Sequence, residues 1–528
     1  MTINQLSNKL YSVQQNHMVS VSFIFIQKPA LSFVEAFMKI VKQCILLCTV
    51  LIIACGIISP KGVSAITIQE EEELSREFME LILAHYEIIK DPLITNYVND
   101  IGQKIVSTLP PQPFSYHFYV IREDTYNAFA TPAGHIFIYS GLLEAMDNEE
   151  ELACILAHEI SHVMCRHISQ KIERAEKVNI ATLAGVVAGV LLGTAGASAA
   201  ANAVTLGSVA AGQSYALAYG REDERQADQI GLNVLRKAGY NGKGLISTLK
   251  KMRSKRWFDS NQIPTYLTTH PASEERMAYI DTWLETHQKT EDNINDYYFK
   301  RAHTRLVAIY GDEGIALRKF KSDVDNHSDD PLAYYGYGLV LERKGDHKAA
   351  EEYLKTALEK RAFDPYILKD LGRLYFLDGN YQQAFSILDG AASINSNDPD
   401  ILFYLGRTQV ELGHLMDAVA TFENLISKQQ NYPRAFYTLG ETYWKLGKEG
   451  DAHYCLGIHY KNKMDFKNAI FHLKKALENV NEPYKKAKVE ELLKEIGKEK
   501  SKSEKEDGNK AQKNWGMKFE DTRQIRSK

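Results

Sequence analysis

A 34-residue period runs through the C-terminal half of this chain of 528 residues. Glycine recurs at this interval, and a second glycine follows each of these seven residues later. The glycines are Gly338, Gly372, Gly406 and Gly440, followed by Gly345, Gly379, Gly413 and Gly447. Small residues at fixed positions of every unit let paired helices pack closely. The period therefore predicts a curved solenoid of stacked helical pairs.

The repeat units resemble tetratricopeptide repeats. Leu371-Gly372-x-x-Tyr375 and Leu439-Gly440-x-x-Tyr443 carry the signature of this repeat, and a further unit follows out of phase at Leu456-Gly457-x-x-Tyr460. We expect an all-α tetratricopeptide solenoid over residues 291–497. Aromatic and arginine side chains suit polypeptide binding. In this register the side chains expected to face the concave groove are Tyr335, Arg373, Phe403, Arg407 and Tyr437.

A second motif lies upstream, in a segment that the sequence predicts to be a helix. His158-Glu159-Ile160-Ser161-His162 places two imidazoles four residues apart on one helical face. Both can then reach one Zn²⁺, and Glu159 is close enough to act on a water beside the ion. The helix is predicted independently of the motif, because Asp147 or Asn148 can form its N-cap and an apolar stripe follows.

A catalytic zinc needs a third protein ligand and one open coordination position. Glu224 and Asp228 lie four residues apart on the next predicted helix. This pattern favours a gluzincin arrangement, in which Glu224 binds the metal and Asp228 orients a ligating imidazole. The alternatives are a solvated helix start, where acidic residues are favoured by the helix dipole, and Glu222 as the ligand. His167 lies about 140° round the helix from His162 and is not expected to bind.

Four motifs in this order resemble the zinc peptidase family of HtpX and the CAAX-prenyl endopeptidases. They are 127–134 (NAFATPAG), Gly141-Leu142-Leu143, His158-Glu159-x-x-His162 and Glu224-x-x-Ala227-Asp228. The resemblance covers roughly residues 66–480. It implies an α+β gluzincin-type zinc peptidase domain, mostly helical with a small sheet, over residues 66–290. The chain departs from the family's membrane-embedded members because it lacks several clear transmembrane helices.

The layout is similar to that of an exported branch of this family with C-terminal tetratricopeptide repeats. The resemblance implies zinc-dependent endopeptidase activity on unfolded or misassembled envelope proteins. It also implies a role in quality control of outer-membrane β-barrel proteins, through contact with the β-barrel assembly machinery. In the expected mechanism, Glu159 takes the proton of a zinc-activated water and passes it to the leaving amine.

A His-Pro segment of the same branch is matched by Thr269-His270-Pro271 together with Arg276. Three roles are open for His270. It could stabilise the oxyanion, it could enter the open zinc position and hold the enzyme latent, or it could be an ordinary loop residue before a proline.

Two strands are expected before the zinc helix. Residues 118–121 and 135–139 are typical of strands, with a turn at residues 131–134 between them. Zinc peptidases commonly hold substrate near such strands, by adding the peptide to a sheet edge. The sequence therefore predicts substrate contact along Asn127, Ala128 and Phe129.

The first 65 residues predict export. A short cationic stretch at residues 38–43 precedes an uncharged apolar run at residues 44–58, and residues 63–65 offer a cleavage site. The apolar run is short for a membrane span of roughly 20 residues. We expect a signal that starts at Met38 and is cleaved after Ala65, giving a periplasmic protein. A lipoprotein signal ending at Cys55 is the alternative.

The segment 178–220 contains no charged residue and is rich in alanine and glycine. It is interpreted either as a helical hairpin over the protease cleft or as a membrane-touching hairpin whose small residues permit close helix contact. Residues 498–528 are charged and low in apolar residues, which predicts a disordered tail. The net charge of −4 gives no basic footprint for nucleic acid.

Three functions follow from these features. The first is an exported zinc endopeptidase with chaperone-like activity in the assembly of β-barrel proteins. The second is a tetratricopeptide scaffold or chaperone whose zinc site is latent. The third is a membrane-associated peptidase that is integral to the membrane; separately, residues 178–220 could make peripheral membrane contact. Biological rescue by Glu159→Gln separates the first two, and release by carbonate washing tests the third.

Overall fold

The computed structural model describes residues 66–174, 220–253, 265–271, 274–287, 296–429, 432–480 and 482–498. The expected signal, nearly all of the apolar segment 178–220 and the tail beyond residue 498 lie outside these residues. Among the helices that are described, none combines the length and the apolar character that a bilayer span requires. The cysteines of the described part, Cys154, Cys165 and Cys455, are free thiols.

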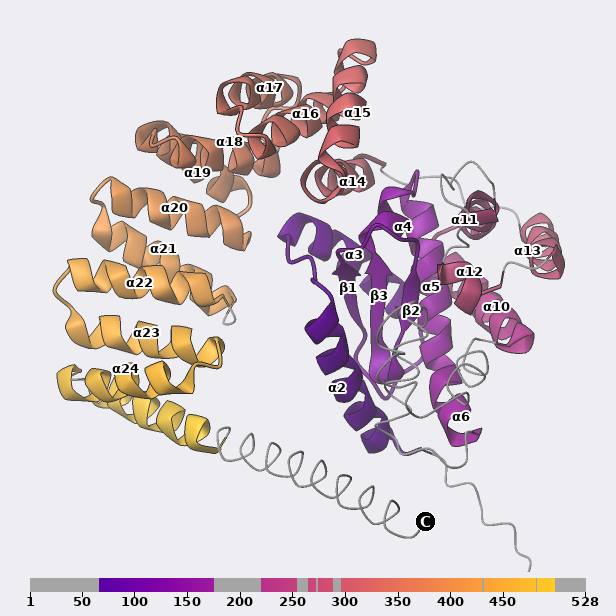
Figure 1. Cartoon of the computed structure of the whole chain (residues 1–528), viewed down its shortest axis with the longest axis horizontal. Helices are drawn as coiled ribbons and strands as arrows, with labels where there is room; N and C mark the ends of the chain where they lie inside the picture. Colours follow the sequence, from indigo (N-terminus) through magenta and orange to yellow (C-terminus); the bar gives the residue numbers. More distant parts are fainter. Residues whose placement is uncertain are drawn as a thin grey trace, which may run out of the picture. The chain divides into compact units, whose positions relative to one another are not determined.

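A small three-stranded sheet lies between helices of the N-terminal domain (Figure 1). Strands β1 (His117–Ile121), β2 (Ala128–Ala130) and β3 (His135–Tyr139) follow the order β1-β3-β2. β1 runs parallel and β2 antiparallel to β3. The 3₁₀ helix η1 (Pro132–Gly134) joins β2 to β3. Its Gly134 has φ +90°, and a Cβ there would lie 2.5 Å from the carbonyl oxygen of Ser115, so the tight turn requires glycine.

Alternation along the strands divides their side chains between two hydrophobic layers. One layer packs with helices α3 (Pro92–Val106) and α5 (Glu149–Met164), and its strand residues are Phe118, Val120, Ala128, Ala130, Ile136 and Ile138. In the other layer, Phe129, Phe137 and Tyr139 pack with α2 (Ile68–His85) and α6 (His167–Arg174). Helices thus cover both faces of the sheet, and α5 is buried along nearly its whole length.

The domain is completed by α4 (Ser140–Glu144), α10 (Arg221–Lys237), α11 (Lys243–Arg253), α12 (Thr265–Thr269) and α13 (Glu274–Thr286). Helix α10 lies directly on α5 (Figure 1). The approach is close at Gly231, where a Cβ would lie 3.3 Å from the carbonyl oxygen of Ala157. A small residue at this crossing therefore lets the helix with Glu224 and Asp228 reach the helix with the two histidines.

The rest of the described chain is a stack of helices in successive pairs (Figure 1). Their bounds are α14 (Asp296–Tyr310), α15 (Glu313–Asn326), α16 (Pro331–Arg343), α17 (His347–Lys360), α18 (Pro365–Leu377), α19 (Tyr381–Ile394), α20 (Pro399–Glu411), α21 (Leu415–Lys428), α22 (Pro433–Lys445), α23 (Glu449–Asn462) and α24 (Phe466–Asn479). Asp-Pro pairs start α16, α18 and α20, where the aspartate caps the helix and proline occupies its first turn.

Glycines position the repeat helices as the period predicts. Gly379 ends the first helix of its pair at φ +75°, a conformation that other residues rarely adopt. Gly372 lies against the second helix, where a Cβ would be 2.6 Å from Leu388. The out-of-phase unit at Leu456-Gly457-x-x-Tyr460 arises because α23 packs on both of its neighbours, α22 and α24. Helix α23 is the second helix of one pair and packs equally closely on α24, with Gly457 against Leu473.

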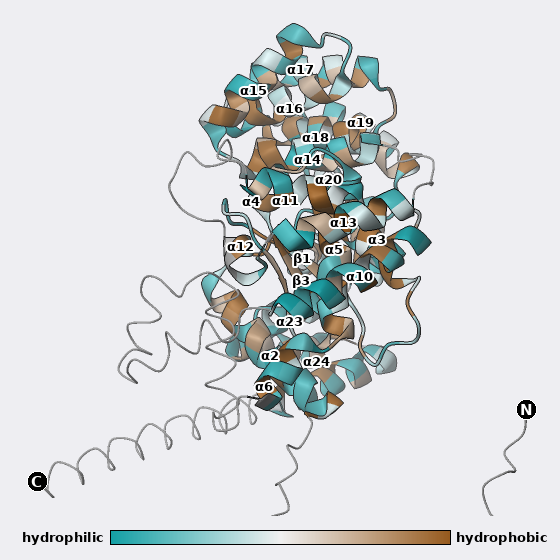
Figure 2. Cartoon of the chain, turned by 90° about the vertical axis from the view of Figure 1, so that its right-hand side faces the viewer, coloured by the Kyte–Doolittle hydropathy of each residue, from teal (hydrophilic) through white to brown (hydrophobic). Residues whose placement is uncertain are grey.

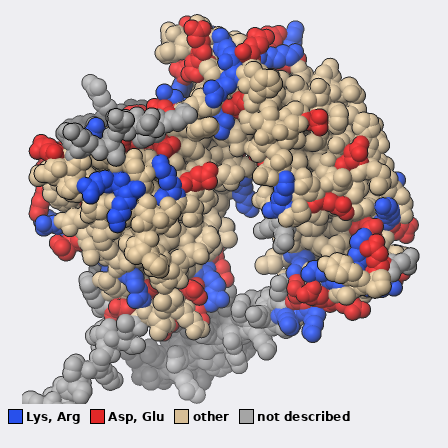
Figure 3. All heavy atoms as spheres, turned by 180° about the vertical axis from the view of Figure 1, so that it is seen from behind, with Lys and Arg blue, Asp and Glu red and all other residues tan. Residues whose placement is uncertain are grey.

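The surface shows no segregation of charge on the face drawn in Figure 3, where Lys and Arg side chains are interspersed with Asp and Glu. Most described helices carry both a hydrophobic and a hydrophilic side (Figure 2). This pattern is expected of helices that bury one face in a shared core. The α+β domain followed by an all-α solenoid agrees with the fold class predicted from the sequence.

Candidate active site

Helix α5 begins where the sequence places it. Asn148 is the N-cap, and its side-chain oxygen accepts a hydrogen bond of 3.0 Å from the backbone N–H of Glu151. The acidic first turn is also held by side chains: Glu149 accepts hydrogen bonds from the hydroxyls of Tyr97 and Tyr240, at 2.6 and 2.7 Å. The helix that presents the two histidines is therefore fixed at its start.

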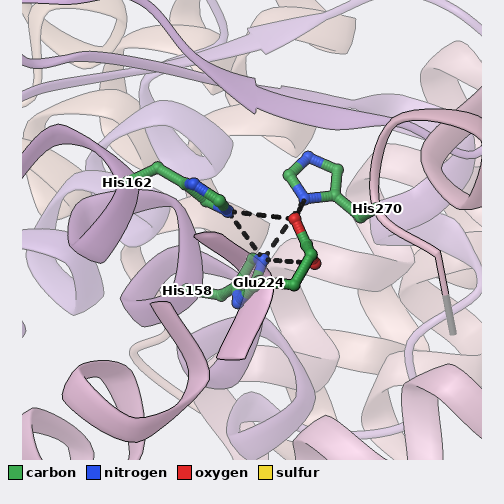
Figure 4. Close-up of side chains that lie close together, drawn as sticks. All are labelled: His158, His162, Glu224 and His270. Atoms are coloured by element: carbon green, nitrogen blue, oxygen red, sulfur yellow. Dashed lines mark hydrogen bonds and ion pairs between the residues drawn. The ribbon is translucent and has the colours of Figure 1, made fainter. Parts of the chain in front are cut away.

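Four side chains from three parts of the chain converge at the C-terminal half of α5 (Figure 4). His158 and His162 come from α5, Glu224 from α10, and His270 directly follows α12. One ligand atom from each lies within 4.8 Å of the others. The Nε2 atoms of His158 and His162 are 3.0 Å apart, and each is 3.4 Å from one oxygen of Glu224. The three predicted ligands are thus brought together, and His270 joins them.

A buried ionic layer supports this group. Oδ1 of Asp228 is 2.9 Å from Nδ1 of His158, a geometry that suits the orienting role expected of this aspartate. Arg276 bridges the two carboxylates of α10: its Nε is 2.6 Å from Asp228 and its Nη1 is 2.6 Å from Glu224. The hydroxyl of Tyr279 also donates to Asp228.

His167 has a position that the sequence did not reveal. Its Nδ1 is 2.8 Å from Nδ1 of His162, and its Nε2 is 3.0 Å from the side-chain oxygen of Gln226. Helix α5 ends at Met164, and Arg166 has φ +53°, so the chain turns back toward the helix. The helical angle used for the sequence prediction therefore does not apply. His167 can hold the orientation of His162, the same kind of contact that Asp228 makes with His158.

His270 is held tightly in place. It is completely buried, and its ring stacks on that of Tyr266 with centroids 4.5 Å apart. Its backbone N–H donates to the carbonyl oxygen of Tyr266 at 2.7 Å. The ring Nδ1 is 2.9 Å from Glu224 and 3.3 Å from Nε2 of His158. Its Nε2 is 3.6 Å from Glu159. His270 therefore lies between the predicted ligand Glu224 and the carboxylate of Glu159.

Burial and neighbouring charges set the protonation of the acids. Burial raises the pKa of Glu159, and the nearby cationic groups only partly oppose it. Burial alone would also raise the pKa of Glu224, but Arg276, His270 and His158 together outweigh burial and lower this pKa well below its usual range. Burial would lower the pKa of His158, yet the carboxylates of Glu224 and Asp228 raise it to about 9. Glu224 is therefore ionised, and the raised pKa of Glu159 makes its carboxylate a stronger proton acceptor than an exposed one.

The residues present fit a metal ion. Two imidazoles and one ionised carboxylate within bonding reach of one point are a donor set typical of catalytic zinc. Both oxygens of Glu159 are buried and accept no hydrogen bond from any described residue, a costly state for a carboxylate without a further partner. An ion with a bound solvent molecule beside Glu159 would remove this cost.

The predicted substrate strand lies at one edge of the described sheet, since β2 pairs only with β3 there. Its side chains are not accessible: Asn127, Ala128 and Phe129 are each at most 1% exposed. A peptide added at this edge would therefore contact backbone rather than these side chains.

The five predicted groove residues do not share one environment. Phe403, Arg407 and Tyr437 line a common pocket between repeat helices. Arg373 is partly exposed and pairs with Glu342 at 2.8 Å. The structure differs from the prediction at Tyr335, which is fully buried. The hydroxyl of Tyr335 forms hydrogen bonds with Arg305 and Asp370, because α14 packs over this part of α16.

Comparisons with known proteins agree with both domains. Residues 92–284 match peptidase family M48, and residues 314–365, 347–399 and 375–441 match tetratricopeptide repeat families. The match to the peptidase family contains all three predicted metal ligands, His158, His162 and Glu224, as well as Glu159.

Three relatives show the extent of the similarity. The beta-barrel assembly-enhancing protease of Yersinia pestis is 31% identical over 251 residues, which cover 47% of this chain and 50% of that protein. The protein of that name from Escherichia coli (strain K12) is 30% identical over 244 residues, covering 46% and 49%. The mitochondrial metalloendopeptidase OMA1 of Schizosaccharomyces pombe is 26% identical over 204 residues, covering 39% and 57%.

The chain thus spans about half the length of the relatives it matches. The family match includes the first three members of the cluster, His158, His162 and Glu224, and also His270. Residues 92–284 are therefore similar to peptidases of family M48, and residues between 314 and 441 are similar to tetratricopeptide repeats.

Proposed function

We propose that this chain is a periplasmic zinc endopeptidase that acts, with chaperone-like activity, in quality control and assembly of outer-membrane β-barrel proteins. One observation carries the proposal. A buried set of two imidazoles and one carboxylate adjoins Glu159, a second carboxylate that accepts no hydrogen bond within the described residues. The names of the relatives support β-barrel proteins as clients. The repeats support a role in holding clients or docking the assembly machinery.

The side chains have distinct roles in this proposal. His158, His162 and Glu224 would hold the zinc ion, and Asp228 fixes the ring of His158 through its Nδ1. When bound, zinc supplies Lewis acidity that activates water and polarises the scissile carbonyl. Glu159 accepts a proton from the attacking water and delivers it to the leaving amine, a transfer that its burial-raised pKa favours.

The position of His270 supports a latent state. Catalytic zinc sites keep one position open, whereas sites with four protein ligands are closed. His270 offers a fourth donor atom within 4.8 Å of the other three, and the stacked ring of Tyr266 holds it there. We therefore assign His270 as the residue that closes the site. Arg276 holds Glu224 and Asp228 in place through ion pairs. Opening requires His270 and the segment after α12 to move away from Glu224.

The test of the catalytic role is Glu159→Gln in the purified chain. The exchange keeps the shape of the side chain and removes the proton acceptor, so cleavage of casein should fall by about 100-fold to 10,000-fold. Zinc content, measured by atomic absorption, should stay at one ion per chain. The matched control is Glu72→Gln, the same exchange at an exposed position on α2, which should leave cleavage unchanged. Cleavage retained by Glu159→Gln would rule out the assigned base.

The test of the closed state is His270→Ala. A site that is open about a tenth of the time gains about tenfold in turnover when the closing group is removed. His287→Ala, which removes an exposed imidazole at the end of α13, is the control and should have no effect. Lower activity in His270→Ala would instead support the oxyanion role, and unchanged activity would support an ordinary loop residue.

The scaffold alternative predicts a different result in cells. If the repeats act while the zinc site stays closed, Glu159→Gln should still restore assembly of β-barrel proteins in a deletion strain. The burial of His270 against Glu224 favours keeping this second candidate. Release of the protein by carbonate washing would exclude the integral-membrane alternative.

A further inference from the structure

A pocket of about 410 Å³ lies between helices α20, α22 and α23 of the repeats. Four cationic side chains line it, Arg407, Arg434, Lys445 and Lys463, against two carboxylates, those of Glu411 and Glu441. The excess of positive charge contrasts with the chain as a whole, whose net charge is −4. We call this site the repeat pocket.

Two of the four cations of the repeat pocket, Arg407 and Arg434, contact aromatic rings rather than carboxylates. Within the part of the chain that the structure describes, none of the four forms an ion pair. The guanidinium carbon of Arg434 is 4.5 Å from the ring centre of Phe403, and that of Arg407 is 4.5 Å from the ring centre of Phe376. Stacking on a ring occupies the flat face of a guanidinium and leaves its N–H edge for a carboxylate.

The spacing of the cations indicates the length of the ligand. Arg434 and Lys445 lie at opposite ends of α22, eleven residues apart, which is about 16 Å along a helix. One carboxylate cannot meet both ends. An extended chain advances about 3.3 Å per residue, so roughly five residues span this distance. Between the ends, Tyr437 is 40% exposed and offers an aromatic surface beside Phe403.

We infer that the repeat pocket binds an extended acidic segment of a client or partner polypeptide, about five residues long. Its carboxylates meet Arg407 and Arg434 at one end and Lys445 or Lys463 at the other, while an aromatic or aliphatic side chain packs on Tyr437. The inference deepens the client-holding role proposed for the repeats and rests on it.

The test uses the full chain carrying Glu159→Gln, so that the probe is not cleaved. The probe is a fluorescein-labelled, C-terminally amidated pentapeptide of alternating glutamate and aromatic residues, and binding is measured by fluorescence anisotropy. Arg434→Gln should weaken binding about tenfold or more, the usual effect of losing a hydrogen bond to a charged group. The double variant Lys445→Gln, Lys463→Gln should weaken it similarly. Lys467→Gln removes an exposed charge on α24 outside the pocket and should change affinity less than twofold.

Four results would overturn the inference. They are no binding of the pentapeptide, equal binding of the same peptide with glutamine in place of glutamate, binding that requires a free C-terminal carboxylate, and an equal loss in Lys467→Gln. Binding and cleavage are separate readouts. A chain that cleaves casein but does not bind the pentapeptide contradicts only this inference, whereas a chain that binds it and never cleaves casein contradicts only the peptidase.

Discussion

The molecule contains two buried clusters of charge that differ in how their charges are balanced. In the metal cluster, Glu224 and Asp228 pair with one guanidinium, that of Arg276, and the carboxylate of Glu159 is buried near them. In the second cluster, Arg305 of α14 lies between Asp91, which caps α3, and Asp370 of α18, and Lys369 is buried beside them. Both clusters are closed to solvent, so burial alone does not distinguish them.

The difference lies in what each cluster lacks. When the imidazoles lose their protons to bind a metal, the metal cluster has a formal excess of two negative charges, which one divalent cation would balance. In the Arg305 cluster the two carboxylates share a guanidinium and a lysine lies close by. Burial alone would raise the pKa of Asp370, but Arg305, Lys369 and Arg373 together lower it to about 2. An incompletely balanced cluster therefore indicates a site for an ion, and a balanced one indicates a structural joint between α3, α14 and α18.

The largest effect is expected from Arg305→Met, which leaves Asp91 and Asp370 buried without their shared partner. Removing one member of a buried ion pair costs about 3–5 kcal/mol of unfolding free energy. Urea denaturation followed by circular dichroism measures this loss. Zinc content per folded chain should not change, since the cluster is separate from the metal ligands.

Arg122→Met is the matched control for this substitution. Arg122 pairs with Glu87 at 3.0 Å on the surface, where both side chains are largely exposed. Exposed pairs contribute about 0–1 kcal/mol. If Arg305→Met costs no more than Arg122→Met, the Arg305 cluster is not a structural joint and the comparison fails.

An intermediate effect is expected from Asp228→Asn, and it should appear in metal affinity. Asp228 contacts His158 through the ring nitrogen opposite the one that faces Glu224. Loss of such a second partner typically lowers metal affinity about 10-fold to 100-fold. Competition with a chromophoric zinc chelator measures the change.

Asp281→Asn, the same exchange at an exposed position on α13, serves as the control for Asp228 and should leave zinc affinity unchanged. A lower unfolding midpoint in Asp228→Asn with unchanged zinc affinity would show that the metal cluster resembles the Arg305 cluster and is structural. Unchanged affinity together with unchanged stability would remove Asp228 from both roles.

Much of this organisation can be read from the sequence, because short-range spacing controls it. The 34-residue glycine period fixes the helical pairs, and the i, i+4 spacing of His158 and His162 fixes their common face. Glu224 could be assigned only through the geometry that zinc requires, since an acidic residue early in a helix is common.

Other features depend on where a helix ends or on how helices pack together, and the sequence does not predict them. The repeat register places Tyr335 on the groove side of α16 but does not reveal that α14 covers it with Arg305. The contact of His167 with His162 depends on where α5 ends and on the left-handed turn at Arg166. The stacking of Tyr266 on His270 joins residues of α12 and the turn after it. In each case the sequence identifies a side chain and the tertiary fold decides its partner.

The smallest effect is expected at the start of the helix that carries the two histidines, and it separates helix stability from metal binding. Asn148→Ala removes the cap of α5 and should cost about 1 kcal/mol. Asn233→Ala, on the exposed side of α10, removes an amide that caps nothing and should cost less. Zinc affinity should stay within twofold in both variants, because the ligands lie more than two turns beyond Asn148. If Asn148→Ala weakens zinc binding as strongly as Asp228→Asn, the donor set depends on the whole helix rather than on its local partners.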